Sequence, residues 1–259
     1  MKLRPERTQM VAFGQQVGKW NDSPPKNSLA IVDKAVLKNF DVIELDTRIS
    51  LDEIAVLGHD DLLKGPDGEI VISRSNVRDL QNFSIGEYEG VPQYVVTLSK
   101  ALMQAGDKRV LIDPRIKPGE YSIIRNSVDT AEYDPEKLLF CVYNPQQAKA
   151  LTEKFPESTH LYKLKTKFTE VSEKALDEAV SLGMDGVMLF RPIYDEDFSA
   201  LMSMLKDRGL QVLFYVHGGW PKPHKPDVVS KSLQNMIDSG VEYVTTICYD
   251  LPEFKKLVR

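Results

Sequence analysis

The sequence predicts a (β/α)8 barrel with a small insertion after the second barrel strand. Apolar segments of strand length alternate with segments of helical period along the whole chain, a pattern typical of repeated βα units. With 259 residues, 42% of them hydrophobic, the chain can bury one large core and fill one barrel. The expected barrel strands cover residues 9–14, 41–46, 109–114, 137–144, 160–165, 186–192, 211–217 and 242–249.

Helices are expected between these strands, because the intervening segments place apolar residues at positions i, i+3, i+4 and i+7. Several of the segments end in glycine, which is common just after the last turn of a helix. The clearest of them cover residues 28–40, 97–106, 145–155, 171–183, 197–209 and 227–240.

One interval departs from the alternation. The segment between Asp46 and the apolar run at 53–60 is too short for a crossover helix, which needs about a dozen residues. We therefore expect an extra strand at the mouth of the barrel, followed by a small insertion over residues 60–93 with a turn at 65–68. The whole chain, residues 1–259, is expected to form one domain.

Composition and charge argue against several classes of protein. The formal net charge is −5 and the basic residues are scattered, so we expect no nucleic-acid partner. No segment approaches the length of a membrane span, and the N-terminal residues do not resemble a signal peptide. Cys141 and Cys248 lie in apolar runs, which is typical of buried free thiols in a reducing compartment. These features predict a cytoplasmic protein without an integral membrane segment.

Acidic residues close two of the expected strands. Glu44 and Asp46 lie two positions apart, so their side chains point to the same side, and Asp113 closes the next strand. Barrel enzymes place their sites at this C-terminal end of the strands. Three crowded carboxylates need a cation, and hard oxygen ligands suit Mg²⁺ or Ca²⁺ rather than zinc. The alternative is that the acids are solvated strand ends, but the wholly apolar runs before them favour a metal site.

Two further residues are expected near this cluster. His59 follows an apolar run a short distance after Asp46, and an imidazole can transfer protons near neutral pH. Arg115 lies two positions after Asp113 and therefore on the same face of its strand. A lone histidine at a strand end more often has a structural role, which remains the alternative for His59.

The segment PKNSLAIVDKAVLKNFDVIELDTRISLDEIAVLGHDDLL, residues 25–63, resembles the glycerophosphodiester phosphodiesterase family, whose pattern has PENTL, then IELDV, then a strand ending in HD. The later segments VVTLSKALMQ, VLIDPR, LFYVHG and GVEYVTTICYDLPEF are similar to the family's PTLEEVL, its strand ending in ExK, its WTVN and its GVDGIITDYP. The resemblance implies a divalent metal on Glu44, Asp46 and Asp113. It further implies acid/base catalysis by His59 and a phosphate contact by Arg115.

The first strand departs from the family pattern, which opens with a strand ending in HRG. Here the strand reads MVAFGQQ, so Phe13 and Gly14, or Ala12 and Phe13, stand where the family has its second catalytic histidine and an arginine. His217 stands where the family's WTVN ends, and it is the candidate to replace the missing group or to bind substrate. The alternative is a polar surface histidine in a loop.

Three more residues are candidates for the substrate pocket. Phe214 replaces the family's tryptophan, and Trp220 follows in the proline-rich loop GGWPKPHKP. Lys165, near the end of its strand, would add positive charge for a phosphate. Each has a structural alternative, since aromatic side chains pack on barrel rims and a rim lysine is often only solvated.

These features together predict a metal-dependent phosphodiesterase that acts on a small glycerophosphodiester-like substrate by hydrolysis or by forming a cyclic phosphate. The alternative, favoured by the missing HRG, is a barrel that binds a phosphorylated ligand without catalysis. A third interpretation is an enzyme for another phosphodiester, such as a polymer or glycan precursor. The stretch between Gly14 and Asn27 and the proline-rich loop indicate the reshaped pocket that such a substrate would need.

Overall fold

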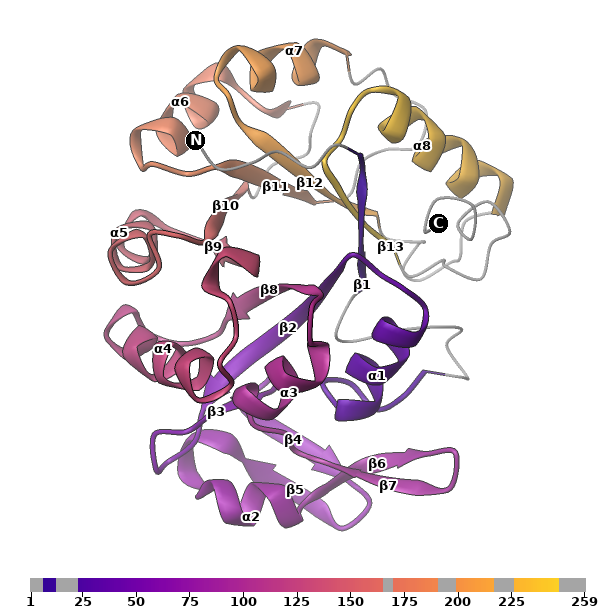
Figure 1. The fold of residues 1–259 in the computed structure, drawn as a ribbon, viewed down its shortest axis with the longest axis vertical. Helices are drawn as coiled ribbons and strands as arrows, with labels where there is room; N and C mark the ends of the chain where they lie inside the picture. Colours follow the sequence, from indigo (N-terminus) through magenta and orange to yellow (C-terminus); the bar gives the residue numbers. More distant parts are fainter. Residues whose placement is uncertain (1–6, 13–22, 165–169, 191–198, 217–225, 247–259) are drawn as a thin grey trace.

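Eight parallel strands form a closed barrel in the computed structural model, which describes residues 7–12, 23–164, 170–190, 199–216 and 226–246 (Figure 1). Their order is β1-β13-β12-β11-β10-β9-β8-β2, and β1 also pairs with β2 and closes the ring. The eight predicted barrel strands are confirmed, with small shifts at their ends. They are β1 (Gln9–Ala12), β2 (Val42–Ile49), β8 (Arg109–Pro114), β9 (Leu138–Val142), β10 (Thr159–Leu164), β11 (Gly186–Phe190), β12 (Gln211–Val216) and β13 (Tyr243–Thr246).

Helices lie around the outside of the barrel (Figure 1). They are α1 (Leu29–Leu37), α3 (Leu98–Ala105), α4 (Tyr121–Thr130), α5 (Pro145–Lys154), α6 (Glu173–Ser181), α7 (Ser199–Asp207) and α8 (Pro226–Asp238), with short 3-10 turns η3 (Pro118–Glu120) and η4 (Pro135–Lys137). Polar side chains begin several of them by accepting a backbone hydrogen bond: Ser28 for α1, Thr97 for α3, Asn144 for α5 and Ser172 for α6. Within the described ranges, no helix is both long and apolar enough to cross a membrane.

Alternate residues of the barrel strands face two different apolar layers. Ile43 and Leu45 of β2 belong to the outer layer, between the strands and the helices. Val42 belongs to the barrel interior, together with residues such as Leu111. Because side chains alternate along a strand, Glu44 and Asp46 share the interior side with Val42. The fold thus places both acids inside the barrel, towards the C-terminal end of β2.

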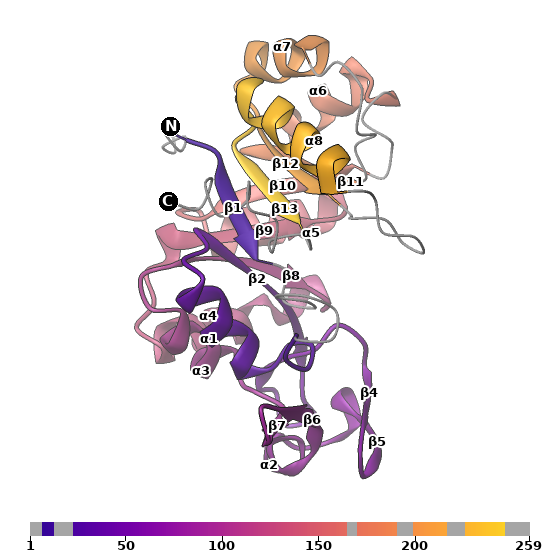
Figure 2. The same cartoon turned by 90° about the vertical axis from the view of Figure 1, so that its right-hand side faces the viewer.

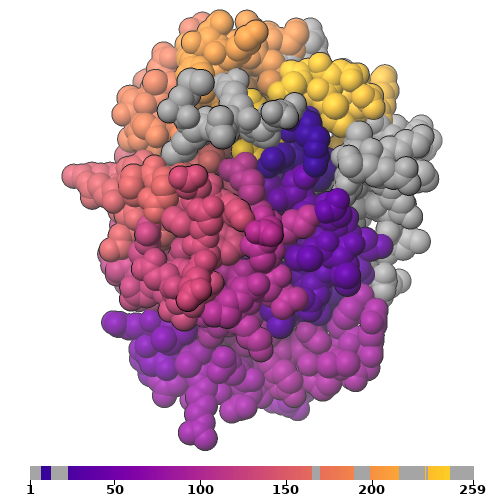
Figure 3. Space-filling view, in the orientation of Figure 1, coloured from indigo at the N-terminus to yellow at the C-terminus, as the bar shows by residue number. Residues whose placement is uncertain are grey.

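The chain between β2 and α3 forms an insertion at one end of the molecule (Figures 2 and 3). The extra strand predicted at the barrel mouth is confirmed as β3 (Ala55–Leu57), which pairs antiparallel with β2. Two antiparallel hairpins follow, and a 3-10 turn and a short helix connect them. These elements are β4 (Leu62–Gly65), β5 (Gly68–Val71), η2 (Ile72–Arg74), α2 (Val77–Asn82), β6 (Ser84–Tyr88) and β7 (Val91–Tyr94).

Close backbone contacts fix the insertion. A Cβ atom at Gly65 would lie 1.9 Å from the carbonyl oxygen of Ser84, so only glycine lets the two hairpins approach this closely. At Gly86, which has a φ of +135°, a Cβ atom would lie 3.1 Å from Cγ of Pro25, just before α1. The insertion also has a small buried cluster of its own, formed by Val56, Ile72, Leu80 and Val95.

Candidate active site

Three carboxylates meet inside the C-terminal end of the barrel. Strands β2 and β8 are parallel neighbours in a register that pairs Asp46 directly with Asp113. Glu44, Asp46 and Asp113 are each 4% exposed or less, and one ligand atom from each lies within 4.8 Å of the others. The convergence predicted from the two strand ends is therefore what the structure shows, and the cause is the pairing of two strands that are distant in sequence.

Arg115 and Asn27 bind this cluster from the rim. The guanidinium of Arg115 donates from Nε to Oδ1 of Asp46, at 3.3 Å, and from Nη2 to Oδ2 of Asp113, at 3.0 Å. The amide of Asn27 donates to Oδ2 of Asp46 at 3.2 Å. Three carboxylates that converge in a buried site repel one another when ionised, and this arrangement of oxygen ligands favours an additional cation.

The electrostatics of Asp46 and Asp113 fit a bound cation. Burial, followed by the charge of Asp113, raises the pKa of Asp46 above its usual range, although Arg115, His59 and Asn27 oppose the shift. The second oxygen of Asp113, Oδ1, is buried and receives no hydrogen bond from any residue that the structure describes. An oxygen-only donor set with such an unsatisfied atom suits Mg²⁺ or Ca²⁺, and Glu44, Asp46 and Asp113 would be the ligands.

A tyrosine and a lysine support Asp113 from the neighbouring strands. Tyr143, just after β9, donates its hydroxyl to Oδ2 of Asp113, the oxygen that Arg115 also contacts. Lys163 of β10 donates to the Tyr143 hydroxyl at 3.0 Å, and its ammonium lies 4.6 Å from the centre of the tyrosine ring. The hydrogen bonds from Tyr143 and Arg115 therefore fix Oδ2 of Asp113 and leave Oδ1 available for a ligand.

Below the acids, the barrel interior contains Tyr215 and Cys141, both buried. Burial, followed by the charges of Glu44 and the other acids, raises the pKa of Tyr215 well above its usual value. The neighbouring residue Phe214, which the sequence analysis assigned to the substrate pocket, is buried in the outer layer beneath the helices. We correct that assignment, because successive side chains of a strand face opposite sides and Phe214 faces away from the barrel interior.

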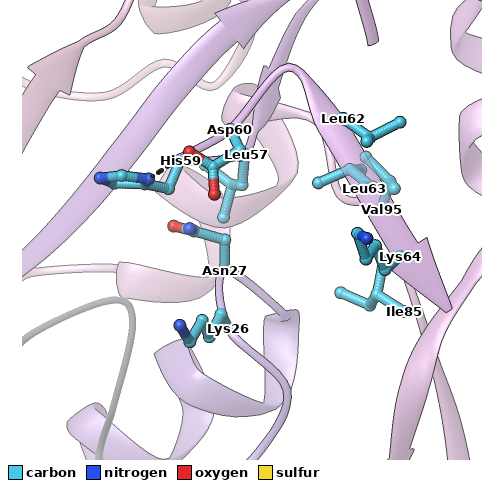
Figure 4. Close-up of a pocket in the computed structure, with 11 residues that line it drawn as sticks. Lys26, Asn27, Leu57, His59, Asp60, Leu62, Leu63, Lys64, Ile85 and Val95 are labelled. Carbon is cyan, nitrogen blue, oxygen red and sulfur yellow. Dashed lines mark hydrogen bonds and ion pairs between the residues drawn. The ribbon is translucent and has the colours of Figure 1, made fainter. Parts of the chain in front are cut away.

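His59 lies in the loop after β3, with its side chain beside that of Asp60 (Figure 4). Its side chain is 34% exposed, and its charge acts to lower the pKa of Asp46, so the imidazole lies within electrostatic reach of that carboxylate. Nδ1 of His59 is 2.9 Å from the carboxylate of Asp60, which leaves Nε2 at the far tip of the ring. Arg48 donates to the carbonyl oxygen of His59 at 2.9 Å and fixes the loop.

Two cavities adjoin the cluster. One, of about 630 Å³, is lined by the basic side chains of Arg48, Arg115 and Lys117 and by Tyr143. The other, of about 270 Å³, lies against the insertion and includes His59 and Asn27. Each cavity therefore contains residues that contact or influence the acidic cluster.

Several predicted site residues fall outside the described ranges: Phe13, Gly14, Lys165, His217 and Trp220. The substrate contacts predicted for Lys165, His217 and Trp220 therefore stay predictions from the sequence. The same holds for the loss of the family's histidine and arginine at Phe13 and Gly14.

Four residues of the site were not singled out by the sequence analysis. Asn27 belongs to the PKNSL motif that carried the family resemblance, and Asp60 belongs to the HD motif. Tyr143 and Lys163 lie at the ends of two predicted strands, on the rim where the acids were expected. Their positions were thus visible in the sequence, but their mutual contacts depend on strand order.

Comparisons with known proteins agree with this architecture. A model of the glycerophosphoryl diester phosphodiesterase family matches residues 20–246. No curated protein matches the chain significantly.

One solved structure of similar fold is a phosphodiesterase from Oleispira antarctica in complex with the product sn-glycerol-3-phosphate. That protein is 19% identical in sequence, and the match covers 97% of this chain and 96% of that one with a TM-score of 0.73. A glycerophosphoryl diester phosphodiesterase from Parabacteroides distasonis is 20% identical, with a TM-score of 0.72 over 99% and 88% of the two chains. A glycerophosphodiester phosphodiesterase from Thermotoga maritima is 16% identical, with a TM-score of 0.68 over 98% and 97%. At these identities the likeness shows a shared fold.

Proposed function

The chain belongs to the glycerophosphoryl diester phosphodiesterase family, and we propose from this that it is a metal-dependent phosphodiesterase acting on a small glycerophosphodiester-like molecule. The observation that carries the proposal is the buried cluster of Glu44, Asp46 and Asp113, in which one ligand atom from each residue lies within 4.8 Å of the others. The similar structure from Oleispira antarctica contains sn-glycerol-3-phosphate as a product, which supports a small phosphodiester as the substrate.

The substrate phosphate would lie at the rim, between Arg115 and His59. Nε and Nη2 of Arg115 bind the carboxylates, and Nη1 makes no hydrogen bond with the described residues, so it can donate to a phosphate oxygen. A divalent cation held by the three acids would withdraw charge from the phosphate and stabilise the transition state. The two adjoining cavities would receive the two alcohol groups that a phosphodiester carries.

His59 would transfer the proton. Its Nδ1 interacts with the Asp60 carboxylate, which orients the ring, so Nε2 would exchange a proton with the reacting oxygen. The attacking group is either water, which gives hydrolysis, or a substrate hydroxyl, which gives a cyclic phosphate.

Phosphorus NMR tests this proposal directly. Purified protein would be incubated with a panel of glycerophosphodiesters and Mg²⁺, Ca²⁺ or EDTA, and the products would distinguish hydrolysis from cyclisation. We expect turnover with one of the cations and none with EDTA. His59→Asn should lower kcat by about 10²- to 10⁴-fold, the usual loss for an acid/base group.

Matched variants separate the site from the rest of the protein. Glu44→Gln should abolish metal-dependent turnover, whereas Glu153→Gln, an exposed residue of α5, should not change it. Absence of turnover with either cation, or turnover that does not depend on His59, would refute the proposed enzyme.

A second candidate function is binding of a phosphorylated ligand without catalysis. The specific observation in its favour is that Phe13 and Gly14 replace the histidine and arginine of the family's HRG motif. Calorimetry with sn-glycerol-3-phosphate distinguishes this case if no diester is turned over. Metal-dependent binding that Glu44→Gln and Asp46→Asn abolish would support it, and unchanged affinity in those variants would exclude it.

A further inference from the structure

The cavity between the barrel rim and the insertion has two unlike walls (Figure 4). We call this cavity, of about 270 Å³, the insertion pocket. His59, Asn27 and Lys26 lie on one side of it, next to the acidic cluster. The opposite wall comes from the insertion and the segment leaving it. It has four aliphatic side chains, Leu62, Leu63, Ile85 and Val95, and one basic side chain, Lys64, which pairs with Glu69 at 2.9 Å.

The insertion pocket shares two residues with the candidate active site. Asn27 lines the pocket and also donates a hydrogen bond to Asp46. His59 lines the pocket and acts electrostatically on the same carboxylate. A group held in the pocket would therefore be joined to the phosphate through an oxygen close to His59.

The chemistry of the walls selects among possible alcohols. None of the described residues that line the pocket is aromatic, and its one acidic residue, Asp60, is paired with His59. A quaternary ammonium such as choline would therefore find neither an aromatic cage nor an unpaired carboxylate. A polyol facing this wall would meet four aliphatic side chains and a lysine that is already paired with Glu69, so most of its hydroxyls would lose hydrogen bonds to water without replacing them. An alkyl chain, in contrast, would exclude water from the exposed parts of Leu62, Leu63 and Ile85.

We propose that the insertion pocket binds a short aliphatic chain on the leaving alcohol of the phosphodiester. The volume is just below the usual range for ligand cavities, so it matches one short chain better than a whole lipid. The inference rests on the proposed phosphodiesterase function, and it specifies the class of alcohol.

The position of His59 makes the alcohol in this pocket the leaving group. The bond between phosphorus and the alcohol oxygen breaks, and that oxygen keeps the electron pair and takes the proton from the His59 imidazolium. A water oxygen forms the new bond to phosphorus and loses its proton to solvent. The products are the free aliphatic alcohol and a phosphomonoester.

A homologous series of substrates tests the inference. The compounds are sn-glycero-3-phosphoethanol, -butanol and -hexanol, beside glycerophosphocholine and glycerophosphoglycerol. We expect kcat/KM to rise by up to about fourfold for each methylene buried, and then to level off when the pocket is filled. The butyl ester should exceed both the choline and the glycerol ester. Equal values along the series, or a preference for either polar alcohol, would overturn the inference.

Variants locate the effect. Leu63→Ser should lower the butyl-to-ethyl ratio of kcat/KM several-fold, because it places a hydroxyl on the aliphatic wall. Leu37→Ser changes a leucine at the last position of α1 that is 84% exposed and does not line the pocket, and it should keep the wild-type ratio. The same ratio in both variants would count against the pocket as its origin.

A binding experiment separates failure of the inference from failure of the proposed function. Methyl-labelled wild-type protein would be titrated with 1-butanol, glycerol and choline chloride, and followed by NMR. We expect 1-butanol alone to shift the methyl signals of Leu63, Ile85 and Val95. If no diester is turned over, the proposed function fails and these shifts decide the character of the pocket. Shifts that are absent, or spread over the whole protein, would refute an aliphatic pocket.

Discussion

The hydrogen bond from Tyr143 to Asp113 leads to a quantitative prediction about cation binding. Replacing Tyr143 by phenylalanine keeps the aromatic ring but removes the hydroxyl that fixes Oδ2 of Asp113 and accepts a hydrogen bond from Lys163. The carboxylate of Asp113 then loses the Tyr143 hydrogen bond and keeps the one from the Arg115 guanidinium. Its Oδ1 atom is therefore less firmly positioned to bind a cation.

The size of the effect follows from the kind of bond removed. A hydrogen bond to a charged group contributes about 1.5 to 3 kcal/mol. Since 1.4 kcal/mol corresponds to about a tenfold change in a binding constant, the affinity for the cation should fall by about 10- to 100-fold. Loss of a hydrogen bond that orients a metal ligand has this same effect in other metal sites, about 10- to 100-fold.

Calorimetric titration with Mg²⁺ and with Ca²⁺ at constant pH measures the change. Tyr133→Phe is the matched control, because it also removes a hydrogen-bonded tyrosine hydroxyl. That hydroxyl donates to the carbonyl oxygen of Lys108, which precedes the N-terminal end of β8, whereas Asp113 lies at the C-terminal end. Its cation affinity should match that of the wild type. A change of less than about threefold in Tyr143→Phe, or an equal loss in both variants, would refute the role assigned to Tyr143.

Three further predictions concern stability, each measured by urea unfolding. Asp46→Asn should stabilise the protein in EDTA by about 1 to 3 kcal/mol at neutral pH. Burial raises the pKa of Asp46, so its ionised carboxylate lowers the stability of the folded state at any pH above the pKa of the unfolded chain. The gain should vanish in acid, where the carboxyl is protonated in both states, and a loss of stability at pH 7 would contradict the prediction. Tyr121→Phe should stabilise by about 1 kcal/mol, since the buried Tyr121 hydroxyl has no hydrogen-bond partner among the described residues. A marked destabilisation would show that the hydroxyl does make a favourable hydrogen bond. Gly65→Ala should destabilise by about 1 to 3 kcal/mol, because the added Cβ would clash with the Ser84 carbonyl, and an unchanged midpoint would show that the hairpins can separate freely.

The barrel and its acidic site could be predicted because both depend on patterns within single strands. The alternation around Ile43, Glu44 and Leu45 assigns each side chain to the outer layer or to the interior from the sequence alone. Parallel strands also end at one rim, so Asp46 and Asp113 could be placed together without knowing their register.

The rest of the site depends on contacts between distant segments. Tyr143 reaches Asp113, and Lys163 reaches Tyr143, only because β8, β9 and β10 are neighbours in the sheet. Asn27 can bind Asp46 from a backbone with a φ of +55°, which no local pattern in the sequence indicates. None of these three contacts has a signature in the spacing of residues.

The error at Phe214 has a different cause. The sequence analysis followed the family's tryptophan to Phe214, although Leu213 and Tyr215 lie on the interior side of β12. A shift of one residue along a strand exchanges the two faces. Alternation along the strand would have favoured Tyr215, which shares the interior with the acidic residues.

The close packing of the two hairpins at Gly65 and Ser84 has a consequence for how this protein could diversify. The acids that hold the proposed cation lie on barrel strands, whereas the aliphatic wall comes from a separate unit between β3 and α3. Such loops change more readily than the strands that carry them. Under the proposed function, replacing both hairpins as one unit would change the specificity for the alcohol group, while the residues that act on the phosphate stayed the same.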